Sequence, residues 1–265
     1  MIRLIATDLD GTLLNNEHKI SDYNKKIISA VNEKGIKFIL STGRPTSAAT
    51  KFLDDLNIET DMISFNGAMI TDRKGNILYE DNLESHIGKE LIEIAKKYKV
   101  YYQGFLGERW NLSDSKSKWL DFYISIAKIN NYKLGFDNIK DFSFSKFMFI
   151  GENHILKEIA KEIDKKLKDK VYYTFSRPVY LEVHSPKVSK ANALSFLLKK
   201  YNIERENIMA FGDNNNDIEM LELAKISVAV ENAESIVKEK AKYITKSNIE
   251  NGVGYFINEY FNLGL

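Results

Sequence analysis

The sequence predicts an α/β fold: a doubly wound parallel sheet with a second, inserted α/β domain. Three observations predict it. Short apolar runs alternate with amphipathic helical stretches near both ends of the chain, which is typical of a parallel sheet with helices on both faces. Two of these runs end in acidic clusters, one beginning at Asp8 and the other at Asp213. Between about 83 and 185 the pattern changes to mixed helices and aromatic-rich strands, which indicates the insertion.

The expected elements follow in chain order. The first part of the core should contain strands at 2–7, 36–40 and 62–65, helices at about 22–34 and 46–56, and a hairpin at 72–76. After 189 we expect a helix, then strands at 207–211, 226–230 and 243–245, a helix at about 215–224, and two further helices. We therefore assign 1–82 and 186–265 to the core and 83–185 to the inserted domain.

Two segments of the inserted domain have clear patterns. Leu156 to Lys170 carries apolar residues at helical spacing, with lysine and glutamate on the solvated face. Tyr180 to Val183 alternates as a half-buried strand does.

Composition limits the possible partners and location. The 265 residues carry 38 basic and 37 acidic side chains, so a net charge of +1 gives no field that favours nucleic acid or an acidic membrane. No stretch is long and apolar enough to span a bilayer. The absence of cysteine suits a reducing compartment, and the first apolar run is interrupted too early for a signal peptide, so we expect a cytoplasmic protein, either a monomer or a weak homodimer.

Asp8, Asp10, Asp213 and Asp217 follow buried strands, where open α/β sheets bind ligands. Each pair of such carboxylates at roughly 4 Å costs about 4 kcal/mol at an effective dielectric of about 20, so the cluster needs raised pKa values or a cation. Oxygen ligands suit Mg²⁺, whereas zinc is disfavoured by the missing cysteines. With Mg²⁺ present, Asp8 could attack phosphorus and Asp10 could serve as acid and base.

Two more segments suit a phosphate group. Ser41 to Pro45 combines hydroxyls, the Gly43 amide and a helix start, and Lys190 lies in the first turn of a helix that Ser189 could cap. Each segment also has an ordinary structural explanation: a Gly turn before a helix-starting proline, and a surface lysine, for which Lys187 is the alternative.

Taken together, these residues resemble the haloacid dehalogenase superfamily, specifically the Cof-like phosphatases with a type IIB cap. The resemblance rests on four motifs in the expected order, and further matches occur at Phe65 to Ala68, Tyr180 to Val183, Val230 to Ala233 and Asn251 to Val253. The motifs are Asp8-x-Asp10-Gly11-Thr12, Thr42-Gly43-Arg44, Lys190, and Gly212-Asp213-x-x-Asn216-Asp217. The resemblance implies a Rossmann-like core with the inserted domain as its cap.

The resemblance also implies roles for individual residues. Asp8 would be the nucleophile and a metal ligand, Asp10 the acid/base with its backbone carbonyl on the metal, and Asp213 the third ligand of Mg²⁺. The phosphate would be held by Leu9 through its amide and by Thr42, Gly43, Lys190 and Asn216. Asp217, Gly11 and Arg44 would support the site, Asp217 by orienting Lys190 or a metal-bound water.

The sequence thus predicts a Mg²⁺-dependent phosphomonoester hydrolase that forms an aspartyl-phosphate. As substrates the resemblance implies small phosphate esters, sugar phosphates first and flavin mononucleotide or pyridoxal phosphate next. Two alternatives use the same residues: a phosphosugar mutase, and a regulator that binds phosphometabolites without turnover.

Overall fold

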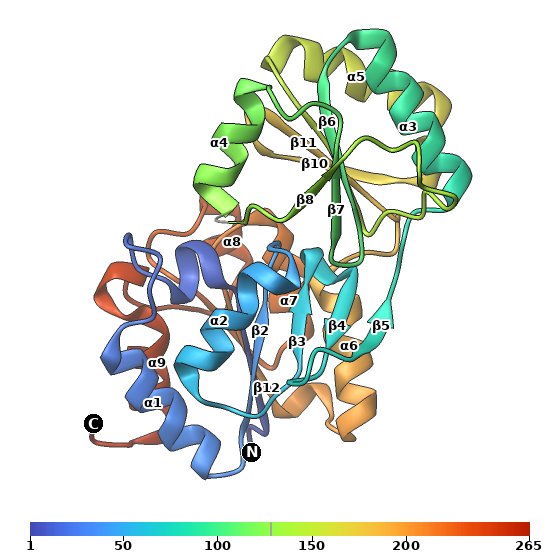
Figure 1. Cartoon of the computed structure of the whole chain (residues 1–265). Coiled ribbons are helices and arrows are strands. Elements are labelled where there is room, and N and C mark those ends of the chain that lie inside the picture. The colour runs from blue at the N-terminus through green and yellow to red at the C-terminus, as the bar shows by residue number, and fades with distance from the viewer. Residues whose placement is uncertain (128) are drawn as a thin grey trace. The chain divides into compact units, whose positions relative to one another are not determined.

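A computed structural model of the chain describes residues 1–127 and 129–265. The chain forms two compact units (Figure 1). The larger unit combines residues 1–79 and 189–265, and the smaller unit contains residues 80–188.

The larger unit is built on an eight-stranded sheet with the order β14-β13-β12-β1-β2-β3-β4-β5. β1 lies between β12 and β2 and is parallel to both, while β4 runs antiparallel to β3. The strands are β1 (Leu4–Thr7), β2 (Lys37–Ser41), β3 (Met62–Ser64), β4 (Met69–Thr71), β5 (Ile77–Glu80), β12 (Ile208–Gly212), β13 (Ile226–Ala229) and β14 (Tyr243–Ile244). The helices are α1 (Asp22–Glu33), α2 (Thr46–Leu56), α6 (Lys190–Tyr201), α7 (Ile218–Leu223), α8 (Ser235–Lys240) and α9 (Gly252–Phe261).

Helices cover both faces of this sheet because successive strand residues point to opposite sides. Ile5 packs in a core with residues of α1, α2 and α9, whereas its neighbours Leu4 and Ala6 pack in a second core with residues of α6, α7 and α8. The predicted α/β class with a mainly parallel core sheet is therefore confirmed (Figure 1). From β1 the strands β2 and β3 follow on one side of the sheet, whereas β12, β13 and β14 follow on the other side. Ligands of such sheets bind where the strand order reverses, so we expect the ligand crevice at the carboxyl ends of β1 and β12.

One predicted helix in this unit is divided. The segment expected to be helical at about 215–224 consists of a 3-10 turn, Asn215–Asp217, followed by the six-residue α7. The turn forms because Asn214 and Asp217 make a capping box, in which the side chain of each residue accepts a hydrogen bond from the backbone N–H of the other. Asp217 is thereby fixed at the start of α7.

The smaller unit has a six-stranded sheet with the order β10-β11-β9-β6-β7-β8. Its strands are β6 (Tyr101–Leu106), β7 (Arg109–Leu112), β8 (Tyr132–Leu134), β9 (Lys146–Ile150), β10 (Tyr172–Arg177) and β11 (Tyr180–His184). Its helices are α3 (Ser85–Tyr98), α4 (Lys118–Ala127) and α5 (Asn153–Lys166). One face of the sheet packs against α3 and α5 in an apolar core that includes Phe147, Phe149 and Leu181.

The other face of this sheet holds a buried ion pair that the sequence does not predict. Lys146 Nζ lies 2.6 Å from Glu182 Oε2, with both side chains at most 7% exposed. Ser176 Oγ donates to Glu182 Oε1 at 2.6 Å, and His184 Nε2 lies 3.7 Å from Oε2. All of β11 is buried, so the expected half-buried strand was wrong in that respect. The ring of Tyr123, on α4, lies 6.0 Å from that of Tyr180, so this face is covered too.

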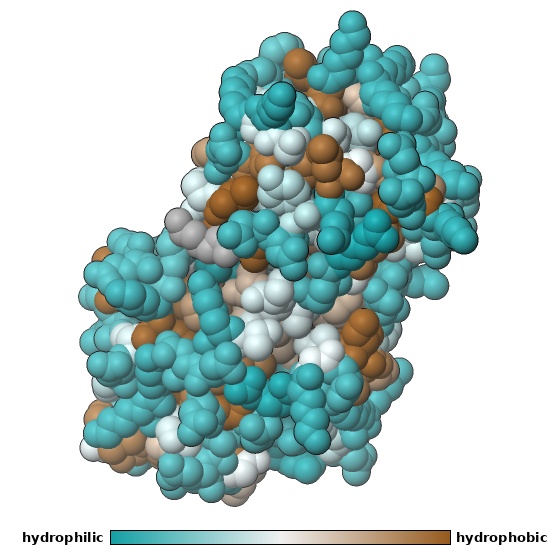
Figure 2. All heavy atoms as spheres, viewed as in Figure 1, coloured by the Kyte–Doolittle hydropathy of each residue, from teal (hydrophilic) through white to brown (hydrophobic). Residues whose placement is uncertain are grey.

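The molecular surface is mainly polar. Figure 2 shows hydrophilic residues over most of the visible face, with hydrophobic residues in small separate patches. Within residues 1–127 and 129–265, no helix has the length and apolar character needed to cross a bilayer.

Candidate active site

The centre of the site is a buried lysine between two buried aspartates. Asp8 directly follows β1, and its backbone N–H donates to the Phe211 carbonyl of β12 at 3.1 Å. Lys190 begins α6, which Ser189 caps by accepting from the Asn192 N–H at 3.1 Å. Lys190 Nζ donates to Asp8 Oδ1 at 2.6 Å and to Asp217 Oδ1 at 2.7 Å. In the sequence, Lys190 is 182 positions from Asp8 and 27 positions from Asp217.

Asp217 uses both of its carboxylate oxygens to hold the site together. Oδ1 accepts from Lys190, and Oδ2 accepts from the backbone N–H groups of Asp213 at 3.0 Å and Asn214 at 3.1 Å. Gly212 allows this close approach, because a Cβ at that position would lie 2.7 Å from the Asp217 carboxyl carbon. The loop after β12 is therefore tied to the start of α6 through one carboxylate.

Burial and neighbouring charges shift the pKa values of these groups. Burial raises the pKa of Asp8 well above its usual range, and the negative charges of Asp217 and Asp213 add to this while Lys190 opposes it. Burial likewise raises the pKa of Asp213 to about 6, with a further contribution from Asp217. For Lys190 burial acts to lower the pKa, but Asp217 and Asp8 outweigh it and the pKa is raised. One lysine thus compensates only part of the cluster's negative charge.

This donor set fits a hard divalent cation. Carboxylate oxygens of Asp8, Asp213 and Asp217 lie within 4.8 Å of one another. Because Asp217 is fully engaged, Asp8 and Asp213 are the better candidates to hold an ion. Asp213 Oδ1 accepts from the Thr12 hydroxyl at 2.7 Å, which leaves Oδ2 for the ion. A cation here would also relieve the repulsion that raises the two pKa values.

Asp10 lies in the turn after Asp8, and its carboxylate does not belong to this group of three. It accepts two hydrogen bonds from Arg44, from Nε at 2.6 Å and from a terminal nitrogen at 2.5 Å, and His18 Nδ1 lies 3.6 Å away. Burial acts to raise the pKa of Asp10, but the hydrogen bonds and charge of Arg44 prevail and the pKa is lowered. Gly11 follows with φ of +86°, and a side chain there would overlap the Asp213 carboxylate.

The remaining predicted phosphate-binding residues lie in separate loops of the larger unit. Thr42 is buried, its N–H donates to the Ile63 carbonyl at 2.9 Å, and its hydroxyl accepts from the Arg44 N–H at 3.1 Å. Asn216 is exposed, and its Nδ2 donates to Asn66 Oδ1 at 2.9 Å. The Leu9 side chain is part of an apolar core.

Two side-chain contacts of the site were not predicted from the sequence. Thr12 binds Asp213, and Asn66 binds Asn216 and lies beside Gly43, where an added Cβ would be 2.8 Å from Asn66 Oδ1. Both belong to stretches quoted for the resemblance, but their partners are far away in the sequence. Only the three-dimensional structure reveals these contacts.

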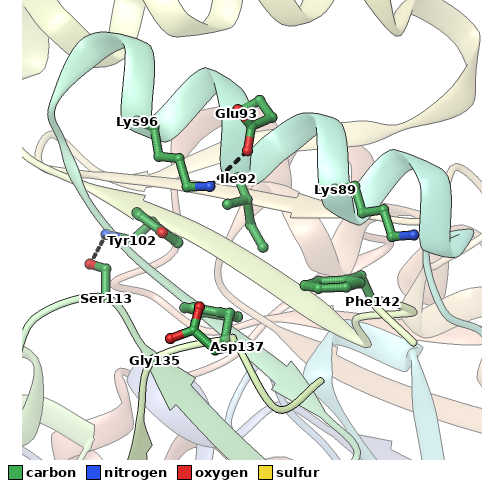
Figure 3. Close-up of a pocket in the computed structure, with 10 residues that line it drawn as sticks. Lys89, Ile92, Glu93, Lys96, Tyr102, Ser113, Gly135, Asp137 and Phe142 are labelled. Carbon is green, nitrogen blue, oxygen red and sulfur yellow. Dashed lines mark hydrogen bonds and ion pairs between the residues drawn. The ribbon is translucent and has the colours of Figure 1, made fainter. Parts of the chain in front are cut away.

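A separate hollow of about 370 Å³ lies in the smaller unit beside α3 (Figure 3). Its charged side chains include Lys89, Glu93, Lys96 and Asp137, and Lys96 Nζ donates to Glu93 at 2.8 Å. Of the residues that the structure describes, those that could hold a metal are the three aspartates of the larger unit. The catalytic candidates are therefore not in this hollow.

Comparison with known proteins identifies the family. Residues 5–257 match the family model of the haloacid dehalogenase-like hydrolases. The chain belongs to this family. Within it, the protein is a Cof-like phosphatase, a hydrolase of phosphomonoesters that acts on small phosphorylated metabolites.

Relatives match over almost the full chain. A 5-amino-6-(5-phospho-D-ribitylamino)uracil phosphatase of Bacillus subtilis, YcsE, is 34% identical to this chain, and the aligned region covers 98% of this chain and 96% of YcsE. A second phosphatase of that name from the same organism, YwtE, is 31% identical, with 97% and 98% covered. A solved haloacid dehalogenase-like hydrolase from Bacteroides thetaiotaomicron has 29% identity and a TM-score of 0.91, with 98% and 100% covered.

Proposed function

We propose that the protein is a Mg²⁺-dependent phosphatase in which Asp8 forms an aspartyl-phosphate. The observation that carries this proposal is the buried contact of Lys190 with Asp8 and Asp217 beside Asp213. Lys190 binds the Asp8 carboxylate through Oδ1, which leaves Oδ2 to attack phosphorus. The ion pair therefore orients Asp8 and still allows it to act as a nucleophile.

In the first step, an Asp8 oxygen attacks phosphorus and the bond to the leaving oxygen breaks. Asp10 gives a proton to that oxygen, so an alcohol departs and the phosphoryl group stays on Asp8. Asp10 then takes a proton from water, the water oxygen attacks phosphorus, and phosphate and free Asp8 carboxylate result. Since Arg44 binds both oxygens of Asp10 in the structure and lowers its pKa, the Asp10 carboxylate must leave Arg44 and take up a proton before it can give that proton to the leaving oxygen.

The other residues bind and orient the phosphoryl group. Lys190 would neutralise charge on its oxygens, and the Thr42 to Gly43 loop and Asn216 would donate hydrogen bonds to them. Asp8, Asp213 and the backbone carbonyl of Asp10 would hold Mg²⁺, which when bound supplies positive charge that stabilises the transferring group. We also propose that residues 83–185 are the cap that selects the leaving group.

For the substrate, we propose phosphate esters of sugars and sugar alcohols. The two relatives are named for an ester of a ribityl chain attached to a heterocycle, and flavin mononucleotide is an ester of the same kind. This narrows the substrate panel without deciding among its members.

The test is phosphate release from sugar phosphates, 5-amino-6-(5-phospho-D-ribitylamino)uracil, flavin mononucleotide, pyridoxal phosphate and nucleotides, with Mg²⁺ or EDTA. Asp8→Asn should reduce release by roughly a thousandfold or more, since it removes the nucleophile. Asp22→Asn is the matched control, because Asp22 is fully exposed on α1. Release that persists in EDTA or in Asp8→Asn would refute the proposed mechanism.

A further inference from the structure

The turn that follows β3 has an unusual backbone. Phe65 and Asn66 are consecutive non-glycine residues with φ of +51° and +59°, and Gly67 follows at +103°. Left-handed conformations are uncommon for residues other than glycine, and a bulky residue such as phenylalanine adopts them only where its surroundings require it. The turn is therefore held in place by its neighbours.

Those neighbours are three separate loops of the active site. The Asn66 N–H donates to the Thr42 carbonyl and the Phe65 N–H to the Arg44 carbonyl, each at 3.0 Å. Gly67 packs against the start of α6, where a side chain would overlap the Ser189 carbonyl immediately before Lys190.

The third loop is reached through a side chain. Asn66 Oδ1 accepts a hydrogen bond from Asn216 Nδ2 at 2.9 Å, across 150 positions of sequence. An amide nitrogen has two hydrogens, so this contact uses one and leaves the other for a ligand. An exposed asparagine with no such contact would populate several rotamers, and binding would have to select one of them.

We propose that Asn66 is a positioning residue of the phosphoryl site. Its backbone fixes the Thr42 loop and its amide oxygen fixes the rotamer of Asn216, so that donors from two loops converge on one anion. This inference rests on the proposed function, since it assigns Asn216 to the phosphate. In this proposal Asn66 orients the side chain of Asn216 and does not itself contact the reacting atoms.

The experiment is a double-mutant cycle on Mg²⁺-dependent hydrolysis of p-nitrophenyl phosphate, with inhibition by inorganic phosphate measured in parallel. Asn66→Gly deletes the amide but tolerates the positive φ. Asn57→Gly is the matched control: Asn57 also has a left-handed backbone, with φ of +51°, at the end of α2, and is exposed. Circular dichroism melting checks that every variant is folded.

We expect Asn66→Gly to lower kcat/KM and to weaken phosphate inhibition by roughly tenfold to a hundredfold, because a displacement of about 1 Å in a binding group can cost about a hundredfold. Asn216→Ala should lose at least as much, and the double variant should be no worse than Asn216→Ala alone. Asn57→Gly should match wild type.

Two results would overturn the inference: Asn66→Gly within twofold of wild type, or losses that multiply in the double variant. If Asn66→Gly does not fold, Asn66→Ala replaces it in the cycle with the same criterion of non-multiplying losses, because it also removes the acceptor oxygen, at a cost of about 1–2 kcal/mol for its left-handed backbone. Absence of any hydrolysis by folded wild type refutes the proposed function instead, while calorimetric binding of inorganic phosphate to wild type and Asn66→Gly still reports on Asn66.

Discussion

Replacing Lys146 with methionine would leave a charged carboxylate buried in the smaller unit without its cation. Lys146 Nζ lies 2.6 Å from Glu182, and the two side chains are 5% and 7% exposed. Methionine has a similar length, so the change removes the charge while keeping most of the packing. The experiment therefore separates the electrostatic contribution from the volume of the side chain.

The expected cost follows from two opposing terms. At 2.6 Å and an effective dielectric of about 20, the attraction is about 6 kcal/mol, but burial of both charges costs a large part of that. Removing one partner keeps the burial cost of the other, so we expect Lys146→Met to lower the free energy of unfolding by about 3–5 kcal/mol. Lys146→Met with Glu182→Met should recover at least half of the loss, because no unpaired charge remains.

Tryptophan fluorescence in urea provides a selective assay. The chain has two tryptophans, Trp110 and Trp119, and both belong to the smaller unit. With a slope of about 1–2 kcal/mol per molar urea, a loss of this size should lower the midpoint by roughly 1.5–5 M in Lys146→Met. A loss below 1 kcal/mol, or a double variant as unstable as the sum of the single changes, would refute the reasoning.

Three further predictions concern other contacts. Burial acts to raise the pKa of Glu182, but Lys146 and His184 outweigh it and the pKa is lowered. The ionised Glu182 side chain therefore contributes fully to the free energy of unfolding above its unfolded pKa of about 4.3, and this contribution is lost as the pH falls further. The urea midpoint should therefore decrease below about pH 4.3, and less steeply in Glu182→Gln; parallel curves would contradict this. Thr12→Val removes the hydrogen bond to Asp213, so the Mg²⁺ concentration for half-maximal activity should rise about tenfold; an unchanged titration would exclude that role. Ser21→Ala removes the N-cap of α1, where Ser21 accepts from the Asn24 N–H at 3.1 Å, and should cost about 1 kcal/mol in chemical denaturation followed by circular dichroism; no change would indicate that water replaces the cap.

The sequence predicted the fold class because local patterns determine it. The helix expected at 46–56 has those bounds, and the strand expected at 36–40 lies at 37–41. The predicted family is also confirmed. It could be predicted because its motifs are short and occur in a fixed order along the chain. By contrast, the half-buried assignment of Tyr180 to Val183 was wrong, because the helix that covers the second face, α4, is remote from β11 in the sequence.

The site could be predicted less completely than the fold. Asp8, Lys190 and Asp213 were named from motifs, and the structure brings them together, while their roles stay predictions. Motifs could not show that Asp217 divides its two oxygens between Lys190 and backbone amides, or that Arg44 holds Asp10. These contacts depend on side-chain directions at the ends of different strands, which no local pattern specifies.

The pairing of β1 with β12 has a consequence during protein synthesis. The register joins Leu4 to Ile208, so the central strand leaves the ribosome some two hundred residues before the strand it pairs with. The stretch 80–188 is contiguous, so all the strands of its sheet have been synthesised before the second half of the larger unit, which must wait for β12 to β14. Until then the edge of β1 that pairs with β12 has no partner, and an unpaired apolar edge favours aggregation. The same delay means that Asp8 can meet Lys190, Asp213 and Asp217 only after those residues have emerged, so a product that ends before Asp217 lacks part of the site.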